Sequence, residues 1–586
     1  MKILLTTLNS KYIHTALSLR YLKSYCEDTF ENLEIQEYTI NHQTDYILGE
    51  IHKGKFDVVC FSCYIWNMNQ TLSIVSNLKK INPNVIVVLG GPEVSFDAVE
   101  LMKRESGVDY VICGEGEETF KELVGFFMYN EKTVENIKGI VYRSKEKIYK
   151  NEERALIDDL GKIPSPFTEN LEEYDNKIIY YESSRGCPYN CRYCLSSTIK
   201  GVRFFPLERV KKDVSIFLKN KVKQVKFVDR TFNVKKSHSL EIMKYIKEND
   251  NGITNFHFEI TADLTDDETL DFLSTVREGL FQFEIGVQST NDQTIKSVDR
   301  NVNFDKLSEV VKKVSDFKNI HLHLDLIAGL PYETYEIFKK SFDDVYNLRP
   351  EQLQLGFLKL LKGSGIRKDE ELHGYAYKAE APYEVLKNKY ISYDELLKLK
   401  MIEEMVDYYY NSSQFKHSVE YIIGNFYNSP FNFYEEVANY WEKAGHHQLS
   451  HPKQAFYKIL LDFYREEGFE GVELFEEILK FDYLMQSKTS LPNFFTTIEI
   501  DHIQQSIHKF LHEEENINKY LLSYKGMQVK KIMKKVHFEV FNYDIITSIN
   551  NSYKIDVQPL KTVILFDYDK ERKIFSKSKY HKVKLN

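Results

Sequence analysis

Short apolar runs alternate with amphipathic stretches through the first 128 residues of the chain. Compact apolar runs predict strands, and apolar residues spaced three or four apart predict helices. The predicted strands are Lys2–Leu8, Leu33–Ile40, Phe56–Tyr64, Val85–Gly91 and Tyr110–Gly116. The predicted helices are Ala16–Cys26, Ile47–Lys53, Gln70–Ile81, Phe96–Lys103 and Glu117–Phe127. Five repeats of a strand followed by a helix predict a doubly wound parallel sheet.

The carboxyl ends of these strands carry glycine and polar residues. They read Asn9-Ser10-Lys11, Ser62-Cys63-Tyr64, Gly90-Gly91-Pro92-Glu93 and Gly114-Glu115-Gly116-Glu117. Open α/β sheets bind ligands at this edge, and glycine lets the backbone approach a large ligand closely. We therefore predict a ligand site at the carboxyl ends of the first sheet.

The strand–helix alternation stops after residue 128 and resumes near residue 177. In between, Gly139–Lys150 predicts a hairpin, and Ile163-Pro164-Ser165-Pro166 predicts a linker. Six further strands are predicted at Ile178–Ser184, Val225–Asp229, Phe256–Ala262, Phe281–Ser289, His321–Ala328 and Gln352–Leu361. Six strand–helix units predict an open parallel barrel with its chemistry at the carboxyl ends of its strands.

The last third of the chain is helical in pattern and rich in Tyr and Phe. Tyr393–Tyr410 predicts a long helix, and Lys561–Ser576 predicts a terminal hairpin. The predicted fold is therefore α/β with four parts: a doubly wound domain at 1–130, a linker and hairpin at 131–176, a partial (β/α)6 barrel at 177–365, and a mainly helical extension at 380–586.

Composition and charge narrow the class of protein. The 586 residues have a formal net charge of −9, which argues against binding nucleic acid through overall charge. No apolar run approaches the roughly 20 residues of a membrane helix, and the start Met1-Lys2-Ile3-Leu4-Leu5 is too short for a signal peptide. We expect a soluble cytoplasmic protein with no membrane contact.

A basic tail begins at Lys570, where seven Lys or Arg residues face one acid, with Phe575 and Tyr580 among them. Basic charge mixed with aromatic rings can bind single-stranded nucleic acid. A solvated tail is the alternative, so RNA stays one candidate substrate or partner.

Three of the seven cysteines, Cys187, Cys191 and Cys194, lie within eight residues. Without a secretion signal, clustered cysteines favour metal binding or catalysis over disulfides. Three thiolates at these spacings can hold three irons of a [4Fe–4S] cluster and leave the fourth iron without a protein ligand. The alternative from spacing alone is a zinc site completed by a distant histidine.

The stretch from Cys187 to Cys194 reads C-x-x-x-C-x-Tyr-C after a predicted barrel strand, which resembles the signature of the radical S-adenosylmethionine (radical SAM) enzymes. With the N-terminal doubly wound domain, the chain resembles their cobalamin-dependent class, which includes the anaerobic protoporphyrin ester cyclase. Supporting stretches are Gly90-Gly91-Pro92-Glu93, Gly114-Glu115-Gly116-Glu117, Val228-Asp229-Arg230-Thr231-Phe232-Asn233, Glu284-Ile285-Gly286-Val287-Gln288-Ser289 and Leu326-Ile327-Ala328-Gly329-Leu330-Pro331. The resemblance covers residues 1 to about 365, and the C-terminal third resembles an uncharacterised extension that implies no substrate.

The resemblance implies that Cys187, Cys191 and Cys194 bind the cluster and that S-adenosylmethionine chelates the open iron. One electron from the reduced cluster then cleaves the cofactor to a 5′-deoxyadenosyl radical, which abstracts a substrate hydrogen. A flavodoxin- or ferredoxin-like electron donor and anaerobic conditions are implied as well.

Four residues are expected to contact S-adenosylmethionine by the same resemblance. Tyr193 would pack at the adenine, and Glu259, Gln288 and Gly329 would line the cofactor from the third, fourth and fifth strands. The residues alone leave other roles open. Glu259 could be a salt-bridged strand residue, Gln288 a helix cap, and Asp229-Arg230 a structural ion pair.

Cobalamin is implied by the resemblance, although one of its usual motifs is missing. Many cobalamin domains carry D-x-H-x-x-G after the first strand, and its histidine ligates cobalt. Here the loop runs from Leu8 to His14 with no Asp-x-His, and His14 is in the wrong register. The departure puts histidine ligation of cobalt in doubt and leaves open that the domain has lost its cofactor.

The resemblance also gives the residues that would contact the corrin or its tail. Ser62, Tyr64 and Trp66 follow the third strand, with packing at a domain interface as their alternative role. Gly90, Gly91, Glu93, Gly114 and Glu115 complete the predicted cobalamin contacts.

The expected function is therefore that of a cobalamin-dependent radical SAM enzyme, and methyl transfer to an unactivated carbon is the commonest chemistry that the resemblance implies. A radical rearrangement, oxidation or cyclisation without methyl transfer, on tRNA or a tetrapyrrole-like substrate, is the first alternative. A noncatalytic sensor that binds cluster and corrin is the second, although a structural cluster would usually have four protein ligands. The sequence predicts neither the substrate nor the oligomeric state.

Overall fold

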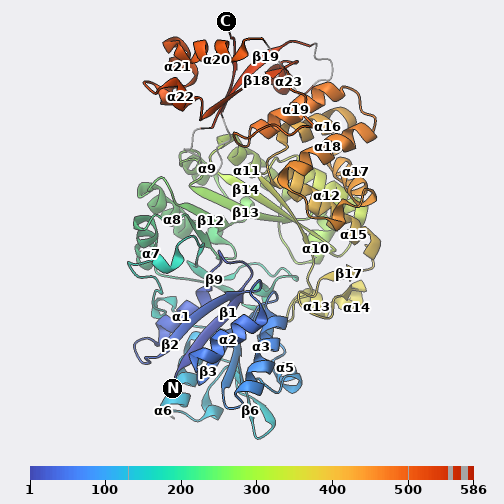
Figure 1. Ribbon diagram of the computed structural model, residues 1–586. Helices are drawn as coiled ribbons and strands as arrows, with labels where there is room; N and C mark the ends of the chain where they lie inside the picture. Colours follow the sequence, from blue (N-terminus) through green and yellow to red (C-terminus); the bar gives the residue numbers. More distant parts are fainter. Residues whose placement is uncertain (130, 499–500, 552, 554–558, 569–578, 586) are drawn as a thin grey trace. The chain divides into compact units, whose positions relative to one another are not determined.

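The computed structural model describes residues 1–129, 131–498, 501–551, 553, 559–568 and 579–585 (Figure 1). The chain divides into two compact units, one made of Met1–Thr334 with Gly356–Ser392 and one made of Tyr335–Leu355 with Tyr393–Asn586. Most of the basic tail from Lys570, and the end of the hairpin predicted at Lys561–Ser576, lie outside the described residues.

The first sheet has the strand order β2-β1-β3-β4-β5-β6-β7. Its strands are β1 (Ile3–Asn9), β2 (Leu33–Thr39), β3 (Val58–Ser62), β4 (Ile86–Gly90), β5 (Tyr110–Ile112), β6 (Ile140–Ser144) and β7 (Lys147–Lys150). β1 to β5 pair in parallel, whereas β6 and β7 form an antiparallel hairpin that extends the sheet beyond β5. The doubly wound parallel sheet predicted from the alternating pattern is confirmed.

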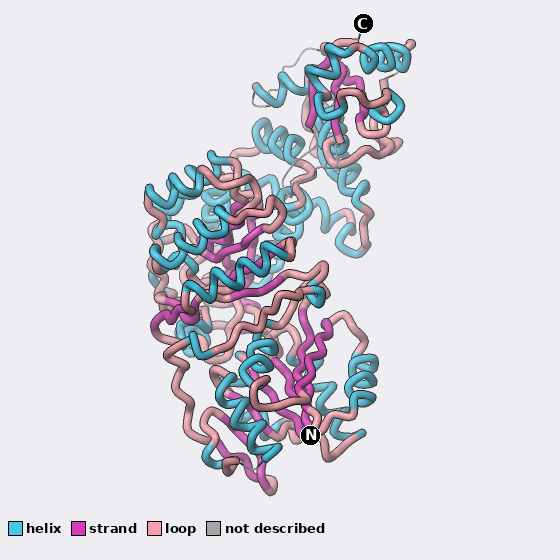
Figure 2. The backbone as a smooth tube through the Cα atoms, turned by 90° about the vertical axis from the view of Figure 1, so that its left-hand side faces the viewer, coloured by secondary structure: helices cyan, strands magenta, loops and turns pink. Residues whose placement is uncertain are grey.

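Helices cover both faces of this sheet (Figures 1 and 2). They are α1 (Leu17–Cys26), α2 (Thr44–Gly54), α3 (Met68–Ile81), α4 (Pro92–Ser95), α5 (Ala98–Arg104) and α6 (Glu117–Tyr129). Leu4 and Leu8 of β1 pack in one core with α2, α3 and α5, and Ile3 and Leu5 pack in the other with α1 and α6. Because both faces are buried, these strands are apolar along most of their length.

The second sheet has the order β15-β14-β13-β12-β11-β8, which is the partial barrel. Its strands are β8 (Ile179–Tyr181), β11 (Gln224–Phe227), β12 (Asn255–Glu259), β13 (Phe281–Gln288), β14 (His321–Ala328) and β15 (Gln352–Phe357). The helices between them in the first unit are α7 (Leu207–Lys219), α8 (Lys236–Glu248), α9 (Asp267–Ser274), α10 (Asp292–Ser297) and α11 (Phe304–Phe317). A two-stranded hairpin, β9 (Ser184–Cys187) and β10 (Gly201–Phe204), follows β8 and carries the cysteine loop.

The barrel strands, unlike those of the first sheet, alternate between buried and half-buried positions, as in β11 and β13. The less buried face is polar. Tyr180, Lys226, His257, Gln282 and His321 are partners across the registers of neighbouring strands. A parallel sheet with helices on both faces would place apolar residues at these positions, so the polar row distinguishes the inner face of the barrel from an apolar core.

The segment after the barrel stays with the first unit. It contains α13 (Gly365–Lys368), α14 (Glu370–His373), β16 (Ala376–Tyr377) and β17 (Val385–Lys387). The backbone of Val385 donates to the Leu358 carbonyl at 2.9 Å, and Leu360 donates to the Tyr383 carbonyl at 3.0 Å. Residues 365–392 are therefore part of the barrel body rather than of the C-terminal unit.

The second unit is mainly helical, as predicted, with one small sheet. It contains α12 (Tyr335–Tyr346), α15 (Tyr393–Val406), α16 (Lys416–Phe426), α17 (Pro430–Lys443), α18 (Lys453–Glu466), α19 (Val472–Leu484), α20 (Ile503–His512), α21 (Glu514–Tyr520), α22 (Val529–Ile532) and α23 (Ile545–Asn550). The antiparallel sheet consists of β18 (Val536–Phe541), β19 (Thr562–Asp567) and β20 (Lys579–Val583). Tyr409, Tyr421, Tyr434, Trp441 and Tyr464 are among its fully buried side chains, so the aromatic richness of this region serves core packing. Among the described residues, no helix combines the length and the apolar character that crossing a bilayer requires.

Gly91, which follows β4, supplies a first test of the fold. Its φ is +107°, and a Cβ atom there would lie 2.6 Å from the Cys63 carbonyl oxygen. Gly91→Ala should therefore lower the melting temperature of the first unit by roughly 5 °C, because this backbone region is strained for any L-residue. Gly49→Ala in α2 is the matched control, since no atom lies within 4 Å of the added methyl and Ala favours a helix over Gly. Circular dichroism melts of both full-length variants decide the point, and equal melting temperatures would contradict the tight turn at Gly91.

Candidate functional site

The three clustered cysteines lie on one loop between β9 and β10. Cys187 ends β9, and Cys194 precedes the short 3-10 helix η4 (Leu195–Thr198). Distant segments hold the loop through its backbone: Arg192 donates to the Val298 carbonyl at 2.9 Å, and Ile366 donates to the Arg192 carbonyl at 2.8 Å. The loop is therefore fixed to the barrel on two sides.

Each of the three sulfur atoms has a polar neighbour, which for Cys191 is Arg300. The Sγ of Cys187 lies 3.5 Å from Thr231 Oγ1, and Cys194 Sγ accepts from the Ser196 backbone at 3.4 Å. Cys191 is 6% exposed, and burial raises the pKa of its thiol. Within the described part of the chain, no three His, Cys, Asp or Glu side chains gather around a point as ligands of a single ion. A [4Fe–4S] cluster needs no such convergence, because each thiolate binds a different iron.

Arg300 is a site residue that the sequence analysis missed. Its Nη1 donates to Cys191 Sγ at 3.7 Å and to Tyr193 Oη at 3.1 Å, and its Nη2 donates to the Gly286 carbonyl. The guanidinium opposes the effect of burial on the pKa of Cys191, so it favours the thiolate. Arg300 follows α10 and lies far along the chain from the cysteine motif. The sequence contains no signal that would identify this arginine, rather than another, as part of the site. It joins the cysteine loop to β13.

Gln288 ends β13 in a strained conformation. Its φ is +72°, and the register between β13 and β14 shifts at this point. Its side chain folds back over Gly286, where an added Cβ would lie 2.2 Å from Gln288 Nε2. Its Oε1 is buried and has no hydrogen-bond partner among the residues that the structure describes. The cap of α10 is Asn291 instead, so the helix-cap role is wrong; strain together with an unpaired buried acceptor is typical of a ligand-binding residue.

Glu259 and Gly329 lie at the ends of β12 and β14. Burial raises the pKa of Glu259 to about 7, and the nearby Arg230 opposes the shift. Gly329 has a φ of +92°, and its carbonyl accepts from Tyr375 Oη at 3.1 Å and Asn388 Nδ2 at 2.9 Å. The predicted contacts from three strands are therefore all at the same edge of the barrel.

Asp229 does not form the ion pair with Arg230 that the sequence left open. It is 1% exposed and accepts from the Ser183 backbone at 2.9 Å and from the Ser183 hydroxyl at 2.7 Å. The Ser184 hydroxyl donates to the same carboxylate at 2.5 Å. Asp229 fixes the chain between β8 and the cysteine hairpin.

The carboxyl edge of the first sheet carries a second group of polar residues, around β1 and β3. Asn67 is fully buried, and its Nδ2 donates to the carbonyls of Leu8 at 3.2 Å and Ser62 at 3.1 Å. The rings of Tyr64 and Trp66 stack with centroids 4.5 Å apart, and Trp66 remains 45% exposed. The order β2-β1-β3 reverses direction between β1 and β3, which is where such sheets bind ligands. Ser62, Tyr64 and Trp66 therefore lie at the expected edge.

Two of the predicted cobalamin contacts have other partners in the structure. Glu93 is 2% exposed and lies 3.0 Å from Lys362 Nζ, and it accepts from the Tyr383 hydroxyl. Glu115 binds Arg203 of β10. Gly90, Gly91 and Gly114 remain at the sheet edge, and no atom lies within 4 Å of a Cβ placed on Gly114. Gly114 leaves room at this edge, whereas the two carboxylates link the first domain to the barrel body.

His14 faces the barrel. Its Nδ1 lies 2.6 Å from Tyr180 Oη, and the Ile178 backbone donates to the Ile13 carbonyl at 2.8 Å. Burial lowers the pKa of His14, with Lys11 and Lys226 adding to the shift. The loop after β1 thus docks on β8, which gives a physical reason for the unusual register of this histidine.

Comparison with known families assigns three parts of the chain. Residues 3–124 match the B12 binding domain, residues 181–345 match the radical SAM superfamily, and residues 371–566 match a family of proteins of unknown function (DUF4080). The resemblance inferred from the cysteine motif and the N-terminal sheet is confirmed by the first two matches. The C-terminal match gives no activity.

Curated relatives match about half of the chain. The cobalamin-dependent radical SAM methyltransferase TokK of Streptomyces tokunonensis is 25% identical over 341 residues, which are 54% of this chain and 49% of TokK. An uncharacterized methyltransferase of Pyrococcus horikoshii is 28% identical over 329 residues, 55% of this chain and 70% of that protein. The chain spans about half the length of the first curated relatives that it matches.

Solved structures extend the likeness in fold to more of the chain. The cobalamin-dependent S-adenosylmethionine radical enzyme OxsB with aqua-cobalamin bound matches with a TM-score of 0.59 at 14% identity, over 82% of this chain and 80% of that one. The radical S-adenosylmethionine methyltransferase TsrM from Kitasatospora setae, bound to tryptophan and a cofactor analogue, matches with a TM-score of 0.55 at 16% identity, over 66% and 80%. These matches confirm the predicted fold class.

The cysteine loop can be tested by metal analysis. Anaerobic reconstitution of the wild-type chain should give about four irons and four sulfides per chain. Cys191→Ala should retain the fold and lose most of this iron, because one of three thiolate ligands is removed. Cys60→Ala is the control, since Cys60 is a buried thiol in the core of the first sheet. Stoichiometric zinc without sulfide in the wild type would contradict the cluster assignment.

Proposed function

We propose that this chain, which belongs to the radical SAM proteins that carry a B12-binding domain, is a cobalamin-dependent radical SAM methyltransferase. One observation carries the proposal: three cysteines on a single fixed loop adjoin the carboxyl edge of a parallel barrel that follows a B12-binding domain. We keep the division at 1–130, 131–176, 177–365 and 380–586 as the proposed functional domains, although residues 380–392 pack with the barrel body.

The residues at the barrel edge fit a cluster and S-adenosylmethionine. Cys187, Cys191 and Cys194 offer three soft thiolate ligands, and Arg300 stabilises the buried one electrostatically. The unpaired Gln288 Oε1 is an acceptor available to a cofactor amine or hydroxyl, and Glu259 can accept a second such bond. Tyr193 and Gly329 would also line the S-adenosylmethionine site. Position 329 requires glycine, because its φ is positive and a Cβ atom there would lie 2.8 Å from Val385. When bound, the cluster supplies the electron that cleaves S-adenosylmethionine, and cobalamin supplies the methyl group.

The edge of the first sheet fits a corrin. Gly114 has open space beside its backbone, Gly91 makes the tight turn after β4 next to Gly90, and the stacked pair of Tyr64 and Trp66 offers an exposed flat apolar surface. The side chain of Ser62 adds a hydroxyl at the same edge, 3.3 Å from that of Ser18. In this proposal Glu93 and Glu115 orient the domain, because their carboxylates are already bound by Lys362 and Arg203.

The inner face of the barrel suggests the polarity of the substrate. Lys226 Nζ and His257 Nε2 lie 2.9 Å and 3.0 Å from Glu284 Oε2, and His323 Nε2 lies 3.0 Å from Asp325 Oδ1. Lys226 and Glu284 stay partly exposed on this face, and hydrocarbon placed against them would remove water without replacing its hydrogen bonds. We infer that the part of the substrate that enters the barrel is polar, with both donors and acceptors. A flavodoxin- or ferredoxin-like protein is the proposed electron donor.

The state of the cobalt tests the role of His14. Because His14 is hydrogen-bonded to Tyr180, and because the dimethylbenzimidazole tail of the bound cobalamin is expected to be displaced from cobalt, the cob(II)alamin form of the chain should show no nitrogen superhyperfine splitting from an axial ligand in its EPR spectrum. His14→Ala should give the same spectrum as the wild type. Splitting that is present in the wild type and absent in His14→Ala would contradict the prediction, and failure of the wild type to bind corrin would indicate that the domain has lost its cofactor.

The fate of S-adenosylmethionine tests methyl transfer. With titanium(III) citrate as reductant, the wild-type chain should form 5′-deoxyadenosine, and it should also form S-adenosylhomocysteine when hydroxocobalamin is supplied. Cys191→Ala should lose the first product and retain the second, because only the first needs the cluster. With substrate, the two products should form in equal amounts and a deuterated methyl group should enter the substrate. Formation of 5′-deoxyadenosine alone in the presence of corrin and substrate would favour rearrangement, oxidation or cyclisation.

A further inference from the structure

The hairpin that carries Cys187 has two arginines directly opposite each other. In the antiparallel register of β9 and β10, Arg185 is the partner of Arg203, and Cys187 is the partner of Gly201. Like charges on directly opposed positions destabilise a strand pair. The hairpin therefore needs negative charge from outside itself.

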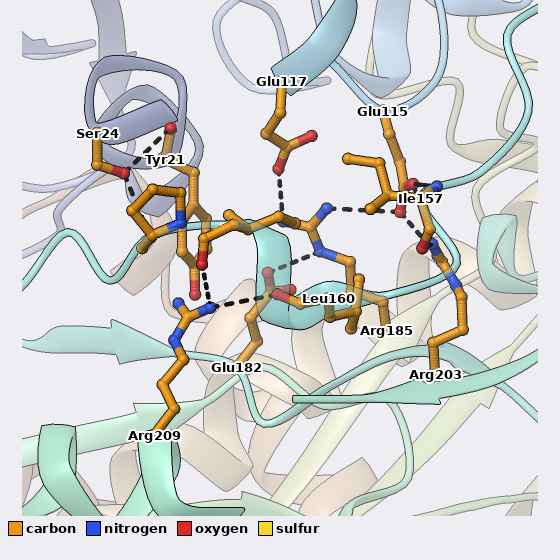
Figure 3. Close-up of polar contacts among 12 residues, drawn as sticks. Tyr21, Ser24, Glu115, Glu117, Ile157, Leu160, Glu182, Arg185, Arg203 and Arg209 are labelled. Carbon is orange, nitrogen blue, oxygen red and sulfur yellow. Dashed lines mark hydrogen bonds and ion pairs between the residues drawn. The ribbon is translucent and has the colours of Figure 1, made fainter. Parts of the chain in front are cut away.

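The B12-binding domain supplies that charge. Figure 3 shows Glu115 and Glu117 reaching toward the two arginines from the turn after β5 and the start of α6. Arg203 binds Glu115 through both terminal nitrogens, at 3.0 Å and 2.7 Å. Arg185 Nη2 lies 2.6 Å from Glu117 Oε1, and its Nη1 lies 3.5 Å from Glu115 Oε1. Glu115 thus contacts both arginines.

Further hydrogen bonds and one more ion pair hold the same side chains. Glu182, from the segment between β8 and β9, binds Arg185 Nε at 2.8 Å. The Ile157 backbone donates to Glu115 Oε2 at 2.9 Å, and its carbonyl accepts from Arg203 Nη1 at 2.6 Å. The side chains of Glu115, Glu117, Arg185 and Arg203 are all less than one fifth exposed. Removal of one partner from such a buried group leaves an uncompensated charge, so the contacts are hard to break singly.

The acidic residues belong to the turn that also borders the proposed corrin site. The turn connects β5 to α6: Gly114, with a φ of +82°, lies near its start, and Glu117 is the first residue of α6. A ligand that fixes Gly114–Glu117 at the sheet edge would also fix the carboxylates that hold Arg185 and Arg203. Arg185 lies two residues before Cys187 on the same strand.

We propose that Glu115, Glu117, Arg185 and Arg203 are positioning residues that couple occupancy of the B12-binding domain to the geometry of the cysteine hairpin. This inference rests on the proposed function for the identity of the ligand, and on the ion pairs for the coupling. The four residues act through the loop that they hold rather than by contact with a substrate. The B12-binding domain thereby takes part in building the cluster site.

Hydrogen exchange on the full-length, cofactor-free chain tests the positioning role. Arg203→Gln and Glu117→Gln should each speed exchange of the 184–204 backbone about tenfold or more, because each breaks one of the ion pairs between the B12-binding domain and the hairpin. Glu118→Gln is the matched control: Glu118 adjoins Glu117 on α6, pairs with Arg154 at 3.2 Å instead, and should leave exchange at 184–204 unchanged. If the four groups act as one network, the variant with both Arg203→Gln and Glu117→Gln should speed exchange at 184–204 by less than the product of the two single-variant factors. Exchange at wild-type rates in both single variants would overturn the proposal.

Addition of hydroxocobalamin tests the coupling. It should slow exchange at 184–204 in the wild type and in Glu118→Gln, and have little effect on this segment in Arg203→Gln. After reconstitution, the EPR spectrum of the reduced cluster in Arg203→Gln should become broader than in the wild type at equal iron content. Corrin binding that leaves the wild-type hairpin unchanged would overturn the coupling. No corrin binding by the wild type would instead overturn the proposed function, and exchange in the cofactor-free variants would still decide the positioning role.

Discussion

A half-buried carboxylate between two arginines links the two halves of the candidate site. Glu115 of the B12-binding domain contacts both Arg203 and Arg185, which face each other across the hairpin that presents Cys187. The charges are shielded from water, so their attraction is only weakly screened. The hairpin, the turn after β5 and the backbone at Ile157 are therefore connected by one network of ion pairs and hydrogen bonds (Figure 3). A residue of a different domain is therefore among the groups that contact the hairpin of the cysteine loop.

Strain and unpaired polar atoms concentrate at the carboxyl edge of the barrel. Gln288 combines a positive φ with a buried acceptor that has no partner, and Gly329 adopts a conformation that its contact with Val385 reserves for glycine. Such features are unfavourable in a protein without a ligand and persist where the surrounding structure enforces them. The partners that enforce them include Tyr375 and Asn388, at the start of the region matched to a family of unknown function. That region therefore contributes to the core of the site through its first residues.

The first domain departs from the usual cobalamin pattern at the loop after β1, and the structure gives a reason. His14 and Thr15 contact β8 through Tyr180 and the Ile178 carbonyl, so the loop is used to dock the domain on the barrel. The polar inner face of the barrel begins at the same point, because Tyr180 is the register partner of Lys226. The two proposed cofactor sites and the polar face thus adjoin within one compact unit.

The sequence by itself determined the parallel strands of the first sheet and of the barrel and the order of these two domains, because alternation of apolar and polar positions is a local signal. It also located the cysteine loop, since three ligands within eight residues need no knowledge of the fold. Arg300, Tyr375 and Asn388 could not be found in this way, because only the folded chain brings them to Cys191 and Gly329. Tertiary structure likewise decided that Glu115 and Glu93 pair with Arg203 and Lys362, although their place at strand ends predicted ligand contacts. A carboxylate takes its role from the charges packed around it, and those charges lie far away in the sequence.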